Sequence, residues 1–330
     1  MFLAAAAVVW WAGTRLTGLV DRVARRLQLG QAFAGMVLLG GITSLPELAA
    51  VSTASLNGDA TLAVNNLLGS AALNVLLLVL ADVVFGRDAL TRVAAQPGTL
   101  MQGVLGMMLL ASVAGVILWG DLSAGSVGVG SVTIAAACLW AMRISSGFER
   151  RKVWRRVDDD EDEPDDEEDN GQPLRSLLLG LAALAATILA AGALLALTAE
   201  GIAEQTGLSS GMVGFLLVAL ATSLPELSSV MAAVRAKRYE LAVGDIFGTN
   251  LFNLALLVLA DLLSTGDEPV LAAAGTFEVV GALVALLMTG AFVVGLLERK
   301  DRTLLRMGYD AVVALLVFIA GMAVMTPLAP

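Results

Sequence analysis

The hexapeptide Thr-Ser-Leu-Pro-Glu-Leu occurs twice, at 43–48 and at 222–227, each time inside a strongly apolar stretch. A proline within a helix removes one hydrogen bond and displaces the preceding turn. Neighbouring Thr and Ser side chains can satisfy the backbone groups that are freed. Each copy therefore predicts an interrupted helix whose carbonyl oxygens lie beside a glutamate, Glu47 or Glu226. Carboxylate, carbonyl and hydroxyl oxygens together suit hard cations such as Ca²⁺, Na⁺ or Mg²⁺.

Polar residues also recur in the apolar stretch after each motif. They are spaced by four, at Asn66, Ser70 and Asn74 in the first copy and at Asp245, Thr249 and Asn253 in the second. Residues four apart lie on one face of a helix, so each set predicts a polar helix face. The match continues at a constant offset of 179 residues, through LLVLAD at 77–82 and 256–261. The two stretches are therefore copies of an internal repeat.

The composition around these motifs is that of a polytopic membrane protein. Of 330 residues, 58% are hydrophobic, and the mean hydropathy is +0.83. A helix needs about 20 apolar residues to cross the hydrocarbon core, and alternating segments typical of a barrel are absent. An all-α fold with ten spans is predicted, near 1–19, 31–56, 61–84, 101–119, 123–142, 175–198, 211–232, 241–262, 272–296 and 308–327.

The basic residues predict the orientation of these spans. All 20 Lys and Arg lie in or directly beside the segments after the odd-numbered spans, with Arg15 in the last turns of the first span and Arg175 at the start of the sixth. Those segments are therefore expected in the cytoplasm and both termini outside the cell membrane. The net charge of −10 comes from one run, DDDEDEPDDEED at 158–169, with 11 acidic residues. Such a run repels itself and is expected to form a solvated, disordered linker. A role for it in attracting cations or binding a regulator stays open.

The predicted spans make the two motif copies inverted relative to one another, because the second span enters from the cytoplasm and the seventh from outside. Inverted repeats with broken helices are typical of secondary transporters, whose sites lie near the membrane midplane. We predict an N-terminal repeat over 1–148, an acidic linker over 149–173 and an inverted repeat over 174–330. The motif regions are 35–82 and 214–261, with spans 2 and 7 broken. A carboxylate at that depth costs about 2.5–3.5 kcal/mol on insertion scales, so a cation or a proton is expected to compensate it.

The paired motifs, TSLPE followed by GS or GT and then an asparagine, resemble the alpha-repeats of the cation/calcium exchanger superfamily, specifically its sodium/calcium exchanger branch. The resemblance covers both repeats and the ten-span layout. It implies that Ca²⁺ binds between Glu47 and Glu226, with the carbonyls of Thr43 and Thr222 as further ligands. It implies the following Na⁺-site and polar residues: Ser44, Ser223, Ser70 and Thr249, the carbonyls near Gly40 and Ala219, and Asn74 and Asn253.

Several positions depart from the pattern of that family. Some exchangers carry an aspartate where this chain has Asn253, while Asn65 stands in place of a usual glycine and Ala71 in place of a usual asparagine. Asp245 stands where the first copy has Asn66. If Asp245 faces the cavity it restores a third carboxylate; otherwise it contacts a hydroxyl or water behind the site. The coupling ion and the stoichiometry therefore stay open.

These residues favour a sodium/calcium antiporter working by alternating access, with a calcium/proton antiporter that uses the same glutamates as the alternative. The chain has no histidine and one cysteine, Cys138, which excludes histidine-dependent catalysis and an internal disulfide. No enzyme activity, cofactor, nucleic-acid partner or obligate protein partner is expected; the partners are the transported ions and the lipid bilayer. Asp82 and Asp261 are expected to be solvated helix ends, with attraction of cations as the alternative. Glu278 is expected to be a partnered or interface-facing residue rather than a proton site.

Overall fold

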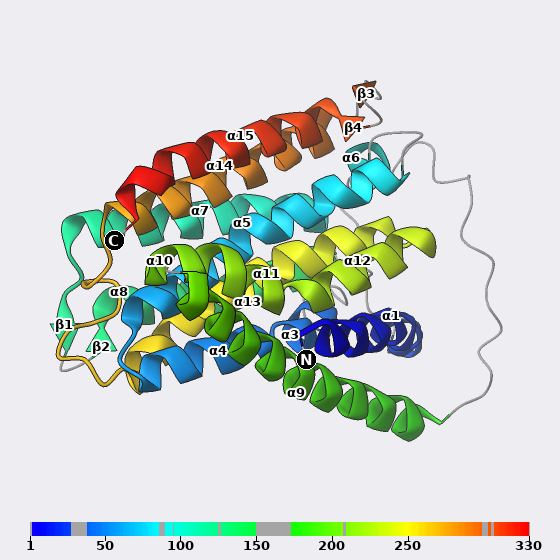
Figure 1. Cartoon of the computed structure of the whole chain (residues 1–330). Coiled ribbons are helices and arrows are strands. Elements are labelled where there is room, and N and C mark those ends of the chain that lie inside the picture. The colour runs from blue at the N-terminus through cyan, green and yellow to red at the C-terminus, as the bar shows by residue number, and fades with distance from the viewer. Residues whose placement is uncertain are drawn as a thin grey trace.

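The computed structural model describes residues 2–27, 38–85, 90–94, 96–124, 127–149, 173–206, 209–298, 303–304 and 307–329, which form a bundle of helices (Figure 1). The long helices are α1 (Phe2–Arg26), α5 (Ala60–Phe85), α7 (Pro97–Trp119), α8 (Val129–Glu149), α9 (Leu174–Thr206), α13 (Tyr239–Leu263), α14 (Thr276–Glu298) and α15 (Tyr309–Met325). The shorter elements are α3 (Gly40–Thr43), α4 (Leu45–Leu56), α6 (Leu90–Val93), α10 (Ser210–Met212), the π-helical η2 (Val213–Val218), α11 (Ala219–Thr222), α12 (Leu224–Arg235) and the 3₁₀ turn η3 (Thr326–Leu328).

Two short antiparallel hairpins complete the fold, each immediately before a long helix. Strands β1 (Ser123–Ala124) and β2 (Val127–Gly128) precede α8, and β3 (Thr303–Leu304) and β4 (Met307–Gly308) precede α15. The order of elements from α3 to α8 therefore recurs from α11 to α15: a kinked helix pair, two long helices, a hairpin and a last helix. This recurrence is the structural counterpart of the repeat in the sequence.

Seven described helices are long and apolar enough to cross a membrane, and an eighth span results if the bent pair Val213–Thr222 and Leu224–Arg235 counts as one. The apolar stretch Val129–Ser145 of α8 is shorter. The predicted second span begins in 28–37, which lies outside the described residues. The prediction of a helical membrane protein is confirmed, while the count of ten spans stays a prediction.

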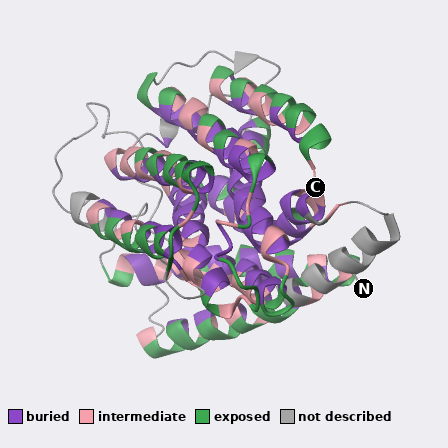
Figure 2. Ribbon diagram, turned by 90° about the vertical axis from the view of Figure 1, so that its left-hand side faces the viewer, coloured by how far each residue is buried: buried purple, intermediate pink, exposed green. Residues whose placement is uncertain are grey.

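Figure 2 shows the buried residues gathered in the centre of the bundle, and α5 and α13 are the most buried of the candidate spans. In the apolar window of α5, 78% of residues are buried, and in that of α13, 67%. The corresponding share is 22% for both α9 and α15, whose outward faces carry exposed leucines. The two helices predicted to carry polar faces are thus shielded by the others, and the perimeter is suited to lipid.

Each proline motif forms a kink one residue wide. Ser44 alone separates α3 from α4, with φ −76° and ψ 1°, and Ser223 alone separates α11 from α12, with φ −81° and ψ 5°. The second pair bends by 47°. Pro46 and Pro225 fall in the first turn of α4 and α12, where a missing N–H is tolerated. The predicted interruptions are therefore present, but as kinks rather than as longer unwound segments.

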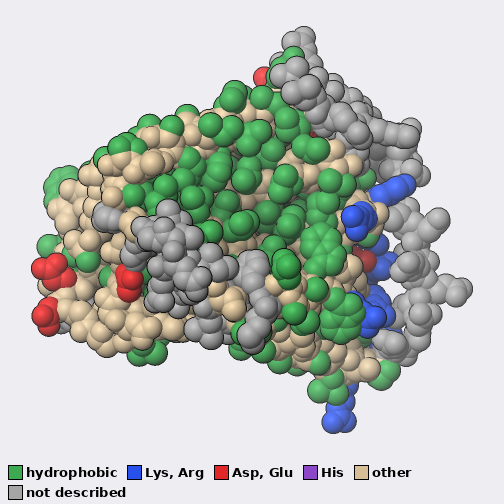
Figure 3. Space-filling view, in the orientation of Figure 1, with side chains coloured by type: hydrophobic (Ala, Val, Ile, Leu, Met, Phe, Trp, Pro, Cys, Tyr) green, Lys and Arg blue, Asp and Glu red, His purple; other side chains and the backbone are tan. Residues whose placement is uncertain are grey.

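Basic side chains gather at one end of the bundle. On the face in Figure 3, Lys and Arg lie at the end where α12 finishes, and several Asp and Glu lie near the β1–β2 hairpin at the other end. Acidic Asp21 also lies at the basic end, paired with Arg25 and Arg238. Hydrophobic side chains cover much of the face between the two ends. The acidic run at 158–169 lies outside the described residues, so its predicted role as a linker is not tested.

Candidate cation site

The two motif glutamates lie in the first turns of α4 and α12 and are completely buried. Neither the Glu47 nor the Glu226 carboxylate has a hydrogen-bond donor of normal geometry among the described residues. The two carboxylates lie close enough to repel each other. The Thr222 hydroxyl lies near Glu47 and the Thr43 hydroxyl near Glu226. Each glutamate therefore faces the motif of the other half.

Other predicted site residues also lack a hydrogen bond of normal geometry among the described residues. These buried groups are the hydroxyls of Ser70 and Ser223 and both polar atoms of the Asn253 amide; the Ser70 hydroxyl lies near Glu47. The Asn66 amide and Oδ1 of Asn74 lack such a bond as well. Buried polar groups are almost always hydrogen-bonded, so these atoms on the two central helices and at the second kink, together with the two carboxylates, indicate a region that can bind a polar ligand, water or an ion.

Asp245 adds a third buried carboxylate, on α13. Its Oδ2 accepts a short hydrogen bond from the Ser229 hydroxyl, and its Oδ1 accepts one from Thr43 Oγ1 at 3.4 Å. It is close enough to both glutamates to repel them. The sequence left two positions open for Asp245, facing the cavity or contacting a hydroxyl or water behind the site. The structure shows contact with two hydroxyl groups, and Asp245 is also close enough to interact electrostatically with Glu47 and Glu226.

The Gly40 carbonyl is where α3 meets α13. It accepts hydrogen bonds from Ser44 Oγ at 2.7 Å and from Thr249 Oγ1 at 3.4 Å. A Cβ on Gly40 would come within 2.9 Å of the Thr249 amide nitrogen, so only glycine allows this approach. In the second half, the Ala219 carbonyl accepts a bond from Thr222 Oγ1 at 3.2 Å. The Gly40 carbonyl thus lies next to two of the predicted hydroxyls, whereas the Ala219 carbonyl binds the hydroxyl of Thr222, a residue predicted to contribute its carbonyl.

A pair of asparagines joins the two central helices. Asn74 Nδ2 donates to Asn250 Oδ1 at 3.0 Å, and Asn250 Nδ2 donates to the Ala71 carbonyl at 3.2 Å. Sequence reasoning did not place Asn250 or Ser229 in the site. The signal for Ser229 was the second serine of TSLPELSS, which stands where the first copy has Ala50.

Three other buried acids have backbone or side-chain partners. Glu278 accepts hydrogen bonds from Asn65 Nδ2 at 2.6 Å and from the Gly275 amide at 2.7 Å, so it is a partnered residue, as expected. The expectation that Asp82 and Asp261 are solvated helix ends is wrong, because they are 1% and 0% exposed. They bind backbone amides that the sequence gave no reason to place beside them.

The chemistry of the site is that of oxygen ligands. Among the described residues, no group of three or more Asp, Glu, Cys or His side chains is placed to share one metal ion. A cation at this site would therefore rely on two carboxylates completed by hydroxyl, amide and carbonyl oxygens. Such mixed oxygen sets suit Ca²⁺ and other hard cations.

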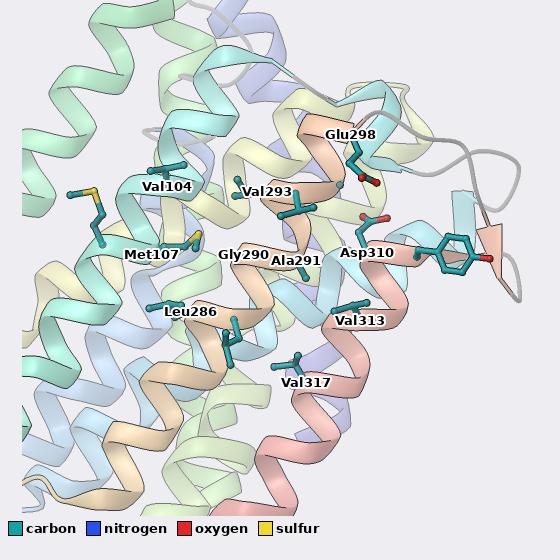
Figure 4. Close-up of a pocket in the computed structure, with 15 residues that line it drawn as sticks. Val104, Met107, Leu286, Gly290, Ala291, Val293, Glu298, Asp310, Val313 and Val317 are labelled. Carbon is teal, nitrogen blue, oxygen red and sulfur yellow. The ribbon is translucent and has the colours of Figure 1, made fainter.

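A separate cavity lies between α7, α14 and α15 and has a volume of about 810 Å³ (Figure 4). Its lining is mainly aliphatic, with Met107, Leu286 and Val313 among the residues, and Glu298 and Asp310 lie at one end. None of the predicted cation-site residues lines it. The cavity is therefore distinct from the region between the two motifs.

A family model described as sodium/calcium exchanger protein matches residues 1–142 and 176–326. The chain belongs to this family. The predicted resemblance is confirmed, and the exchanger is a membrane cation transporter, not an enzyme.

Relatives and a solved structure extend this likeness over most of the exchanger. Inner membrane protein YrbG of Escherichia coli (strain K12) is 29% identical over 313 residues, covering 88% of this chain and 92% of YrbG. Uncharacterized membrane protein MJ0091 of Methanocaldococcus jannaschii is 25% identical over 234 residues, 71% of each chain. The sodium-calcium exchanger NCX_Mj, soaked with 2.5 mM Na⁺ and 10 mM Sr²⁺, matches with a TM-score of 0.67 at 19% identity, covering 98% of this chain and 96% of that one. That match shows the same fold.

Proposed function

We propose that this exchanger moves Na⁺ and Ca²⁺ in opposite directions across the cell membrane, with Ca²⁺ held between Glu47 and Glu226. The observation that carries the proposal is the four carboxylate oxygens of these residues, completely buried and without a donor of normal geometry among the described residues. Two adjacent buried carboxylates are strongly unfavourable unless a cation or protons neutralise them. A divalent cation neutralises both at once.

The surrounding groups support Na⁺ as the counter-ion. Ser44, Ser223, Ser70 and Thr249 supply hydroxyls, and Gly40 and Ala219 supply carbonyls, around the glutamate pair. Hydroxyl and carbonyl oxygens bind a monovalent hard cation without adding charge. In this proposal Asn74 and Asn253 are polar groups deeper along α5 and α13, and Thr43 and Thr222 add their carbonyls at the Ca²⁺ site.

The membrane arrangement that we propose has ten spans as two inverted repeats, 1–148 and 174–330, with both termini outside and the acidic segment 149–173 in the cytoplasm. The gathering of Lys and Arg side chains at one end of the bundle supports it. Alternating access to one central site then follows from the two inverted halves.

The site assignment is tested by replacing each glutamate in turn. Glu47→Gln and Glu226→Gln each remove one of the two carboxylates proposed to contact Ca²⁺. Calcium-45 uptake into proteoliposomes should therefore fall to background in both variants. Glu278→Gln is the matched control, since Glu278 is a buried glutamate bonded to Asn65 and Gly275, and it should retain uptake. Full transport by Glu47→Gln would refute the assignment.

The coupling ion is tested with the wild-type protein. Calcium-45 uptake is compared in proteoliposomes loaded with Na⁺, with K⁺ or choline, and with an imposed pH gradient. Uptake that requires internal Na⁺ supports the proposal. Uptake that ignores Na⁺ and follows the pH gradient would instead establish the calcium/proton alternative, in which Glu47 and Glu226 carry protons.

A further inference from the structure

Two aspartates connect the halves of the molecule in equivalent ways. Asp82 lies near the end of α5, and its Oδ2 accepts a hydrogen bond from the Gly308 amide at 2.6 Å. Asp261 lies near the end of α13, and its Oδ2 accepts one from the Gly128 amide at 2.9 Å. Gly128 and Gly308 are the last residues of β2 and β4, directly before α8 and α15. Each aspartate thus holds the hairpin of the opposite half.

The second oxygen of each aspartate binds within its own half. Asp82 Oδ1 accepts the Leu90 amide at 2.6 Å, and Asp261 Oδ1 accepts the Val270 amide at 2.7 Å. The hydroxyl of Ser131, at the start of α8 in the opposite half, also donates to Asp261 Oδ2, beside the Gly128 amide. Both aspartates are buried, and burying a carboxylate is costly unless its oxygens are bonded. The arrangement is therefore specific and depends on both oxygens.

These contacts affect the cation site because α5 and α13 each run as one continuous helix from the site to the aspartate. Ser70 lies twelve residues before Asp82, and Thr249 lies twelve residues before Asp261, a distance of about 18 Å along a helix. A slip of one residue would move such a side chain by about 1.5 Å and turn it by about 100°. Whatever fixes the end of each helix also fixes where its polar face stands relative to the other half.

We propose that Asp82 and Asp261 are positioning residues of the cation site, which set the axial position of α5 and α13 by holding each to the opposite half. The proposal rests on the proposed function for the identity of the ion. It assigns no ligand role to either aspartate. The consequence is that their loss weakens cation binding at a distance, without removing any group that contacts the cation.

The test measures calcium-45 equilibrium binding to purified Asp82→Asn and Asp261→Asn, per mole of folded protein. Asparagine has one carbonyl oxygen, so one of the two amides loses its acceptor and faces an NH₂ group instead. We expect the half-saturating Ca²⁺ concentration to rise at least fivefold in both. Asp59→Asn is the matched control: Asp59 Oδ1 accepts the Leu62 amide within the same half at 2.8 Å, a bond that involves neither hairpin. It should bind as wild type does.

A double-mutant cycle tests whether the Asp82–Gly308 bond itself is responsible. Gly308 has φ −60° and ψ 152°, which proline adopts, and Met307 before it is in a strand, as proline prefers. Gly308→Pro removes the amide. If the bond is direct, the effects of Asp82→Asn and Gly308→Pro on the half-saturating concentration are clearly less than multiplicative in the double variant. Fully multiplicative effects would overturn the assignment.

Hydrogen–deuterium exchange on the same proteins separates this proposal from the proposed function. If Asp82 is a positioning residue, Asp82→Asn should exchange its amide hydrogens faster at Gly308 and also along residues 66–74 of α5. If Asp261 is one, Asp261→Asn should do so at Gly128 and along residues 245–253 of α13. Wild-type protein that binds no Ca²⁺ would refute the proposed function, while this exchange pattern would still support positioning. Faster exchange confined to the hairpins, or variants that are folded and bind Ca²⁺ normally, would overturn positioning.

Discussion

At the scale of residues, the two copies of the repeat carry different side chains at two equivalent positions near the glutamates. The first half has Ala50 and Asn66, and the second has Ser229 and Asp245 at the same offset. Ser229 donates to Asp245, whereas the Asn66 amide has no partner among the described residues. The hydroxyl and the carboxylate therefore occur together, as a buried carboxylate requires. The result is one extra negative charge on one side of the glutamate pair.

This asymmetry predicts a specific effect of Asp245→Asn. Removing a charge within electrostatic reach of both glutamates should lower Ca²⁺ affinity about tenfold, which corresponds to about 1.4 kcal/mol. The measurement is calcium-45 binding to the purified protein. Asp267→Asn, in an exposed loop, makes the same charge change away from the site and should have no effect. Unchanged affinity in Asp245→Asn would mean that Asp245 only accepts the hydroxyls of Ser229 and Thr43.

Much of the site was predictable from the repeated motif, because a glutamate after a proline in an apolar stretch has few explanations. The contacts of Asn250 and Ser229 were not, since both depend on how α13 packs on the other half and no local pattern encodes that. Asp82 and Asp261 were misread for a similar reason. Their partners in the opposite half, Gly308 and Gly128, are backbone amides in hairpins. The strands of these hairpins have two residues each and are too short to show alternation in the sequence.

At the scale of elements, each glutamate lies in the first turn after a kink, three residues beyond Ser44 or Ser223, so we expect the kinks to set the direction of the glutamates. The sequence predicted the interruptions from Pro46 and Pro225 but not their width, because the width depends on packing against α5 and α13. A π-helical segment, η2, leads into the second kink. Such segments occur often at functional sites.

Replacing Pro46 or Pro225 by alanine tests this role of the kinks. Alanine restores an N–H and favours a straighter helix, so the protein should unfold at an unchanged or higher temperature while calcium-45 uptake falls at least tenfold. Pro97→Ala is the control, because Pro97 is the first residue of a regular helix, α7, and should leave uptake unchanged. Normal uptake by both kink variants would show that the kinks do not set the site geometry.

Close packing between α5 and η2 predicts a different outcome for Gly69→Ala. A Cβ at Gly69 would come within 2.2 Å of the Phe215 carbonyl oxygen, so the helices must separate, at a cost of about 1–3 kcal/mol. Gly106→Ala, where a Cβ meets nothing within 4 Å, should be neutral or stabilising. Thermal unfolding of the two variants in detergent measures the difference. Equal midpoints would contradict the contact.

At the scale of the whole molecule, the halves are interlocked rather than merely adjacent. Thr43 donates to Asp245, Asn74 to Asn250, and Thr249 to the Gly40 carbonyl, each from one half to the other. The hairpin contacts of Asp82 and Asp261 add a bond at each far end. The site therefore exists only when both halves are folded together, and its residues cannot be understood from either motif alone.

The gathering of Lys and Arg at one end of the bundle predicts the orientation of the protein in a cell membrane. With Cys138 replaced by alanine, a single cysteine is placed at Asp267 or at Lys237, both exposed and at opposite ends of α13. Because basic segments stay in the cytoplasm, a membrane-impermeant maleimide added to intact cells should label Asp267→Cys and not Lys237→Cys. Permeabilised cells, in which both should react, are the control. The reverse labelling pattern would invert the proposed topology and exchange the outward and inward faces of the site.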